Sequence, residues 1–171
     1  FLPFRGFNDT LFLITTYTKI KTITFIPDIL YHYYLRYDSQ IHNININDVN
    51  NLKKYLLEVK KIYKEKQKYE EMKYILDMMV FIHLGISVMY RLSYDKEVLI
   101  KKEIEETIKY LDKEFPTWRN SPFLKLNYCM RKGIKHLGLL VISKLYKLNK
   151  PMLFIHIYKF VIDKLKIDIK F

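Results

Sequence analysis

Asp9 is the carboxylate whose place in the sequence most readily suggests chemistry. It follows Asn8 and precedes an apolar run at residues 11–14, so it stands where a helix should begin. One reading is a helix cap, in which the side chain accepts backbone N–H bonds and interacts favourably with the helix dipole. The other is a general base that takes a proton from an attacking hydroxyl. Spacing alone favours the cap.

A second group of chemically useful residues lies in the tyrosine-rich run at residues 31–39. Arg36 can pair with a phosphate, and the hydroxyl of Ser39 can donate to a phosphate oxygen. Tyr33 and its neighbours offer aromatic rings on which a sugar or base can stack. The alternative is an edge strand that half buries its tyrosine rings and leaves their hydroxyls in water. Composition alone favours the edge strand.

The sequence shows no motif for several other chemistries. The five histidines are scattered, and no pair stands at i, i+4 beside a carboxylate, so we expect no metal site within this chain. His83 and His156 lie in apolar runs and are predicted to be hydrogen-bonded core residues. A glycine-rich phosphate loop and a nucleophile elbow are missing from the sequence. Cys129, the single cysteine, is predicted to serve as a small apolar residue.

Positive charge is concentrated in the last third of the chain. The net charge is +12, residues 116–171 contain 12 basic and 2 acidic side chains, and residues 119–150 contain no acid. Such a block suggests an anionic neighbour. The longest uncharged stretch, Met78 to Tyr90, has 13 residues. Because a spanning helix needs about 20, we expect the chain to lie on a membrane rather than cross it.

The elements that would position these residues change in character along the chain. Residues 8–19 are predicted to form a short helix, 22–26 a strand, 29–36 a second extended run and 37–47 a loop. From Asp48 onward the pattern is helical. The apolar stripes of the predicted helices are Val49, Leu52, Leu56, Val59 and Tyr63; then Ile100, Ile104, Ile108 and Leu111; then Ile134, Leu137, Val141, Leu145 and Leu148.

Boundary signals support this division into helices. Residues 69–92 read as one helix that is buried at its centre, and Asp95 is predicted to cap the helix that follows. Pro122 and Pro151 each stand at a predicted first helical position.

The order of motifs near the N-terminus resembles the end of the catalytic domain in bacterial family 2 glycosyltransferases. Asn-Asp-Thr-Leu-Phe at residues 8–12 is similar to the family's Glu-Asp-x-x-Phe. A helix follows, then Ile-Thr-Phe-Ile-Pro-Asp-Ile-Leu-Tyr at 23–31 and Tyr-Tyr-Leu-Arg-Tyr-Asp-Ser at 33–39, where the family has a strand, a Leu-Tyr pair and an arginine-containing segment. Phe115-Pro116, with Trp118 and Asn120, resembles the helical C-terminal region of capsule and wall-polymer members.

This resemblance implies a mainly α chain: a small α/β end-piece of a GT-A nucleotide-sugar domain at residues 1–46, then a bundle of about five helices at 47–171. It implies an inverting sugar transferase for surface polysaccharides, with Asp9 as the catalytic base. By the same resemblance Asn8, Tyr33, Arg36 and Ser39 bind substrate.

The donor site would precede Phe1, together with an Asp-x-Asp motif for a divalent metal such as Mg²⁺ or Mn²⁺, so the chain alone should be inactive. The implied partners are a nucleotide-sugar donor, a saccharide or lipid-linked acceptor and an anionic membrane surface. The implied location is the cytoplasm or the inner face of the cell membrane.

Two alternatives from other classes stay open. The basic block is compatible with a helical interaction module or a nucleic-acid-binding module, although the sequence carries no readable nucleic-acid motif and we expect no such partner. A helical scaffold without chemistry would leave Asp9 as a cap only.

Overall fold

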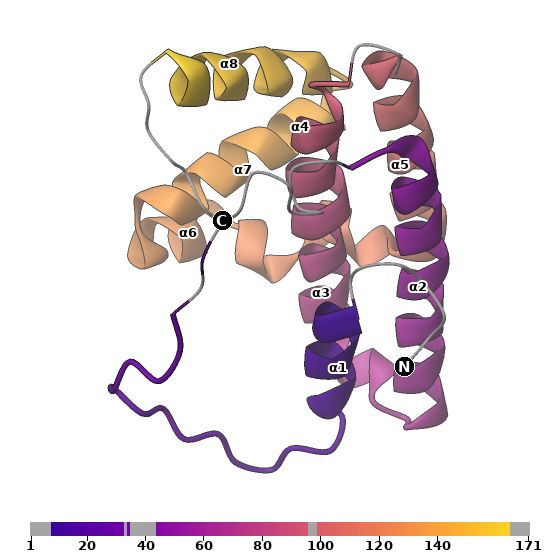
Figure 1. The fold of residues 1–171 in the computed structure, drawn as a ribbon, viewed down its shortest axis with the longest axis vertical. Coiled ribbons are helices and arrows are strands. Elements are labelled where there is room, and N and C mark those ends of the chain that lie inside the picture. The colour runs from indigo at the N-terminus through magenta and orange to yellow at the C-terminus, as the bar shows by residue number, and fades with distance from the viewer. Residues whose placement is uncertain (1–7, 33, 35–43, 96–98, 165–171) are drawn as a thin grey trace. The chain divides into compact units, whose positions relative to one another are not determined.

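The structure is a computed structural model of the 171-residue chain that describes residues 8–32, 34, 44–95 and 99–164. This part is mainly helical, which confirms the coarse fold prediction (Figure 1). Its α-helices are α1 (Asn8–Thr16), α2 (Ile46–Glu65), α3 (Tyr69–Val80), α4 (Met89–Leu92), α5 (Ile100–Glu114), α6 (Leu126–Lys132), α7 (Ile134–Lys147) and α8 (Pro151–Asp163). A π-helical segment (Phe81–Val88) joins α3 to α4, and two 3₁₀ turns (Pro116–Asn120 and Pro122–Leu124) join α5 to α6.

The chain divides into two compact units, unit 1 at Phe1–Glu70 and unit 2 at Glu71–Phe171. The sequence places a boundary between residues 46 and 47 for a different reason, because that boundary marks the expected end of a catalytic domain. The compact units follow packing, which groups α1 with α2. The functional boundary therefore stays a prediction.

Unit 1 is built on the apolar stripe of α2. The five predicted stripe residues, from Val49 to Tyr63, are all buried. A capping box begins the helix: the Asn45 side chain accepts from the Asp48 N–H, and the Asp48 carboxylate accepts from the Asn45 N–H, both at 3.1 Å. The stripe predicted from periodicity is confirmed.

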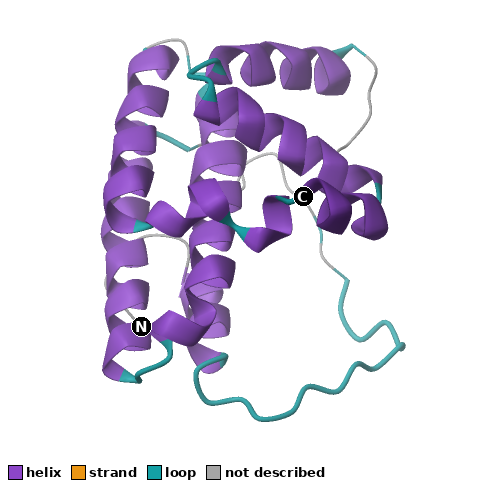
Figure 2. Ribbon diagram, turned by 180° about the vertical axis from the view of Figure 1, so that it is seen from behind, coloured by secondary structure: helices purple, strands orange, loops and turns teal. Residues whose placement is uncertain are grey.

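The segment after α1 contains no strand within the described residues. Residues 20–32, together with 34, have no regular secondary structure apart from bends at Lys21 and Asp28 (Figure 2). A strand is held by hydrogen bonds to a neighbouring strand, and no partner strand occurs in the described part of the chain. The strand predicted at 22–26 is thus not seen here.

The centre of unit 2 is the continuous helical stretch from Tyr69 to Leu92. By length and composition this stretch could cross a membrane, contrary to the expectation from the uncharged run. Such a finding is weak, because the core helix of a globular protein passes the same test, and 61% of the apolar window is buried.

The middle of that stretch widens into the π-helical segment, where Gly85 meets an aromatic cluster. Phe81 stacks on Trp118 with ring centroids 4.6 Å apart and meets Tyr146 edge-on at 5.3 Å. The Tyr146 hydroxyl donates to the Gly85 carbonyl. A Cβ on Gly85 would lie 3.1 Å from the Phe81 ring, so the close packing requires glycine. The sequence pattern did not predict the π-helical turn.

Helix boundaries agree with the sequence in two places and differ in a third. Pro151 starts α8, and Ser121 caps the turn at Pro122 by accepting from the Phe123 N–H at 3.3 Å. Asp95 does not cap α5, because that helix begins at Ile100 with Leu99 before it. The prediction of an Asp95 cap is therefore wrong.

Candidate functional site

Asn8 and Asp9 are the first two residues of α1. Asp9 therefore lies inside the first turn rather than in the flanking cap position, although still at the positive end of the helix dipole. This backbone position is compatible with both roles predicted for the carboxylate, a stabilising charge and a general base.

The helix that carries Asp9 is fixed to α2 near its other end. The Tyr63 hydroxyl donates to the Ile14 carbonyl at 2.8 Å, and both side chains are buried. Burial raises the pKa of the Tyr63 hydroxyl, and nearby Tyr17 raises it further, so Tyr63 stays a neutral donor. Within unit 1, α1 thus rests on a fixed support.

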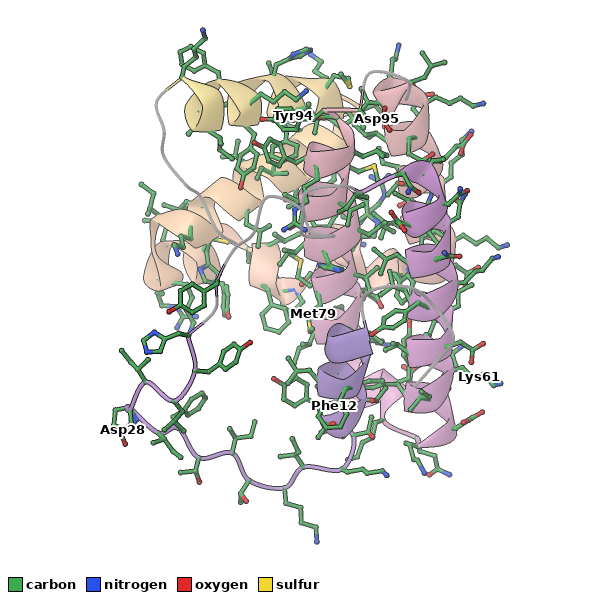
Figure 3. All side chains as sticks on the ribbon, in the orientation of Figure 1. Phe12, Asp28, Lys61, Met79, Tyr94 and Asp95 are labelled. Carbon is green, nitrogen blue, oxygen red and sulfur yellow. The ribbon has the colours of Figure 1, made fainter. Side chains whose placement is uncertain are left out.

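The segment that carries the rest of the predicted site exposes its large apolar side chains. Phe25 is 89% exposed and Ile29 80%, and Leu30, Tyr31 and Tyr34 are exposed to a similar degree. Figure 3 shows Asp28 and the neighbouring side chains along this segment. Large apolar groups in such numbers usually mark a surface that contacts another molecule or domain.

Three of the predicted substrate-binding residues, Tyr33, Arg36 and Ser39, lie outside the described residues. The structure therefore places Asn8 and Asp9 together on α1, and it does not test whether the other three join them.

A polar cluster fixes residues 115–120 in unit 2. The buried carboxylate of Asp77 accepts from the Thr117 N–H at 2.9 Å and from the Thr117 hydroxyl at 2.6 Å. Asp112 accepts from the Trp118 indole N–H at 3.0 Å and from the Arg119 guanidinium at 2.6 and 2.7 Å. These carboxylates already hold strong donors, so we assign them a structural role.

The histidines and the cysteine do not form a reactive centre in the described residues. No group of three or more His, Cys, Asp or Glu side chains there could hold a metal ion. His156 is exposed, so the prediction that it lies in the core is wrong, whereas His83 is half-buried. Cys129 is buried, as predicted, and burial raises its thiol pKa, which makes it a poor nucleophile.

A second surface with chemical character lies on α6, α7 and α8. Exposed lysines and arginines occur there beside exposed apolar side chains, and residues 119–150 contain no acid. On α7, burial and the nearby charges of Arg119 and Lys144 lower the pKa of Lys147. The described part of this surface is thus strongly positive.

Comparison of the chain with known protein families, with curated proteins and with solved structures finds no match.

Proposed function

We propose that this chain is the C-terminal portion of an inverting glycosyltransferase of the family 2 type, which moves a sugar from a nucleotide-sugar donor to a surface-polysaccharide acceptor. The observation that carries the proposal is the order of elements after Phe7: Asn8-Asp9 at the start of α1, then an exposed apolar segment with the family-like sequence at 23–31.

In this proposal Asp9 acts as the base. Its carboxylate takes the proton of the acceptor hydroxyl while that oxygen forms a bond to the anomeric carbon. The bond from the same carbon to the diphosphate breaks on the opposite face, and the nucleoside diphosphate leaves with the electron pair. Attack from the opposite face inverts the anomeric centre.

The other predicted residues bind and enclose the substrates. Arg36 and Ser39 hold the loop that covers the diphosphate and keep water from competing with the acceptor. Tyr33 stacks on a sugar or base, and Asn8 contacts the acceptor. The reaction takes place in the cytoplasm or at the inner face of the cell membrane.

A divalent metal would neutralise the departing diphosphate in such an enzyme. The described residues do not fit this metal, because they hold no group of suitable ligands. We assign the metal to the donor-binding part of the enzyme and route no step through this chain.

The exposed segment supports the idea of a missing partner domain. Residues 22–26 and 29–31 have β-branched and aromatic side chains typical of strands, yet they lie in irregular chain with their apolar groups in water. We propose that they complete the sheet of a GT-A domain, which would bury these side chains and satisfy the backbone. The α/β end-piece forms in that context.

The test compares two carboxylates at helix N-termini in the complete enzyme. Asp9→Asn should lower the transfer rate by about 10²–10⁴-fold, because a positioned base contributes that much. Asp48→Asn is the matched control, since it removes one charge from the first turn of α2 and should leave the rate unchanged. Transfer is followed with a radiolabelled donor, and donor binding by calorimetry.

Near-normal transfer in the Asp9→Asn enzyme, with a lower melting temperature like that of Asp48→Asn, would establish the capping role and remove Asp9 from the mechanism. Arg36→Lys tests the donor side separately. Lysine lacks the planar fork of arginine, so nucleotide affinity should fall, and unchanged affinity would exclude Arg36 from the site.

A further inference from the structure

Helix α7 has two apolar sides, and only one of them packs in the core. Leu139, Leu140, Ile142 and Tyr146 are buried. On the opposite side, Ile134 is 85% exposed, Val141 56% and Leu148 67%. Their spacing of seven residues puts these three on one line along the helix. The stripe that periodicity selected is therefore the outer side of α7.

Helix α8 repeats this arrangement. Its buried side chains include Phe154 and Ile155, whereas about half of each of Leu153, Ile157 and Phe160 is exposed, at i, i+4 and i+7. The two helices pack against each other (Figure 1). Because each stripe lies opposite the buried side chains of its own helix, both belong to the outer surface of unit 2. We call these six residues, Ile134 to Phe160, the outer stripes.

Basic side chains accompany the outer stripes. Residues 126–163 contain seven Lys and Arg and one Asp. Arg131, Lys132, Lys135, Lys144 and Lys150 are all exposed. Helix α5 in the same unit differs, because its four lysines are balanced by five acids. The apolar outer stripes thus coincide with the positive part of unit 2.

We propose that the outer stripes and their lysines dock on the surface of an anionic lipid bilayer. A bilayer offers both complementary features, a layer of phosphate groups for the lysines and an apolar interior for the stripes. A second copy of the chain would bring two positive surfaces together, and a nucleic acid would leave the apolar stripes in water. The proposal is independent of sugar transfer, because binding needs no donor.

Co-sedimentation of the 171-residue chain with vesicles tests the proposal. One set of vesicles contains equal phosphatidylcholine and phosphatidylglycerol, and the other only phosphatidylcholine. We expect binding to the anionic vesicles alone, and a fall of at least about 10-fold as salt rises from about 0.05 to 0.5 M, because salt screens the attraction. Equal partitioning into both sets, or none into either at low salt, would overturn the proposal.

Matched variants locate the binding surface. Replacing Lys132, Lys135 and Lys144 by Gln should weaken binding roughly 100-fold, about 5-fold for each charge. The control replaces Lys101, Lys102 and Lys109 on α5, three exposed lysines outside the proposed surface. Comparable losses in both variants would show that only net charge matters, and would contradict docking through this surface.

The apolar requirement separates a bilayer from a nucleic acid. Ile134→Ser with Val141→Ser and Leu148→Ser should abolish vesicle binding, whereas Ile75→Ser with Leu99→Ser should not, although Ile75 and Leu99 are also exposed. Circular dichroism checks the fold of each variant, and the lysine variants give a test that leaves the core untouched. If a labelled DNA duplex binds in place of vesicles, and the serine variant binds it normally, the surface is a nucleic-acid site and the membrane proposal is wrong.

Discussion

Helices α2 and α7 have the same kind of apolar stripe in the sequence, and the fold uses the two in opposite ways. In α2 every stripe residue is buried, whereas α7 turns Ile134, Val141 and Leu148 toward solvent. The remaining sides explain the difference. Asn50, Lys54 and Lys61 on α2 are polar and exposed, so that helix has one apolar side to bury. Around α7 a second apolar side exists and takes the core position.

This contrast teaches what a surplus apolar side means. Periodicity identifies the buried side of a helix only when the other sides are polar. When two sides are apolar, the fold buries one, and the other stays available for a further partner. The following predictions test that distinction, beginning with the inner side of α7.

The largest effect should come from the aromatic cluster against which the inner side of α7 packs. Trp118→Ala removes the ring that stacks on Phe81 and meets Tyr146 edge-on. It should lower the free energy of unfolding by about 3–5 kcal/mol, because a large cavity opens in the core. Urea unfolding followed by circular dichroism measures the loss. A change below about 1 kcal/mol would contradict the central role of the cluster.

The direct test of the comparison uses one substitution in each helix. Val59→Ala on α2 should cost about 1.5–3 kcal/mol, since it removes fully buried methyl groups. Val141→Ala on α7 should change stability by less than about 0.5 kcal/mol, since that side chain is exposed. Amide hydrogen exchange reports each helix separately. Similar losses at both positions would show that the outer side of α7 is buried in solution.

A smaller effect should follow from the hydroxyl that joins α7 to the π-helical segment. Tyr146→Phe keeps the ring but leaves the Gly85 carbonyl without its donor in the core. The expected loss is about 1–3 kcal/mol. Trp118 is the chain's single tryptophan and lies in unit 2, so its fluorescence in urea follows this unit. Tyr74→Phe at an exposed site is the control, and equal stability of both variants would exclude a contribution from the bond.

Sequence reasoning predicted the features that depend on local signals. The α2 stripe, the helix starts at Pro122 and Pro151 and the buried Cys129 all follow from side-chain type and near neighbours. The inner side of α7 could not be predicted, because choosing between two apolar sides requires knowledge of Phe81 and Trp118, which lie far away in the sequence.

The candidate site was open to sequence reasoning to a different degree. Residue types supplied Asp9 and Arg36 as candidates, and the structure adds that α1 begins at Asn8. Periodicity gave no hint of the π-helical segment, although Gly85 inside an apolar run was a usable signal. A strand at 22–26 needs a neighbouring strand, and no local propensity can supply one.

The smallest expected effect concerns Lys147, at the edge of the outer side of α7. Burial opposes its charge, and so do Arg119 and Lys144, so the pKa of its amine lies below the ordinary 10.5. The folded state therefore binds this proton less tightly than the unfolded chain, and at neutral pH the charge destabilises the fold. Lys147→Met should raise the free energy of unfolding by less than about 1 kcal/mol, because solvent screens this partly exposed group. The gain should be full near pH 7 and disappear as the pH approaches 10.5, where the wild-type amine is neutral in both states. Urea titrations at several pH values measure it, with Lys144→Met as the more exposed control. A gain that stays constant up to pH 10.5 would mean that methionine packing, rather than the removed charge, stabilises the variant.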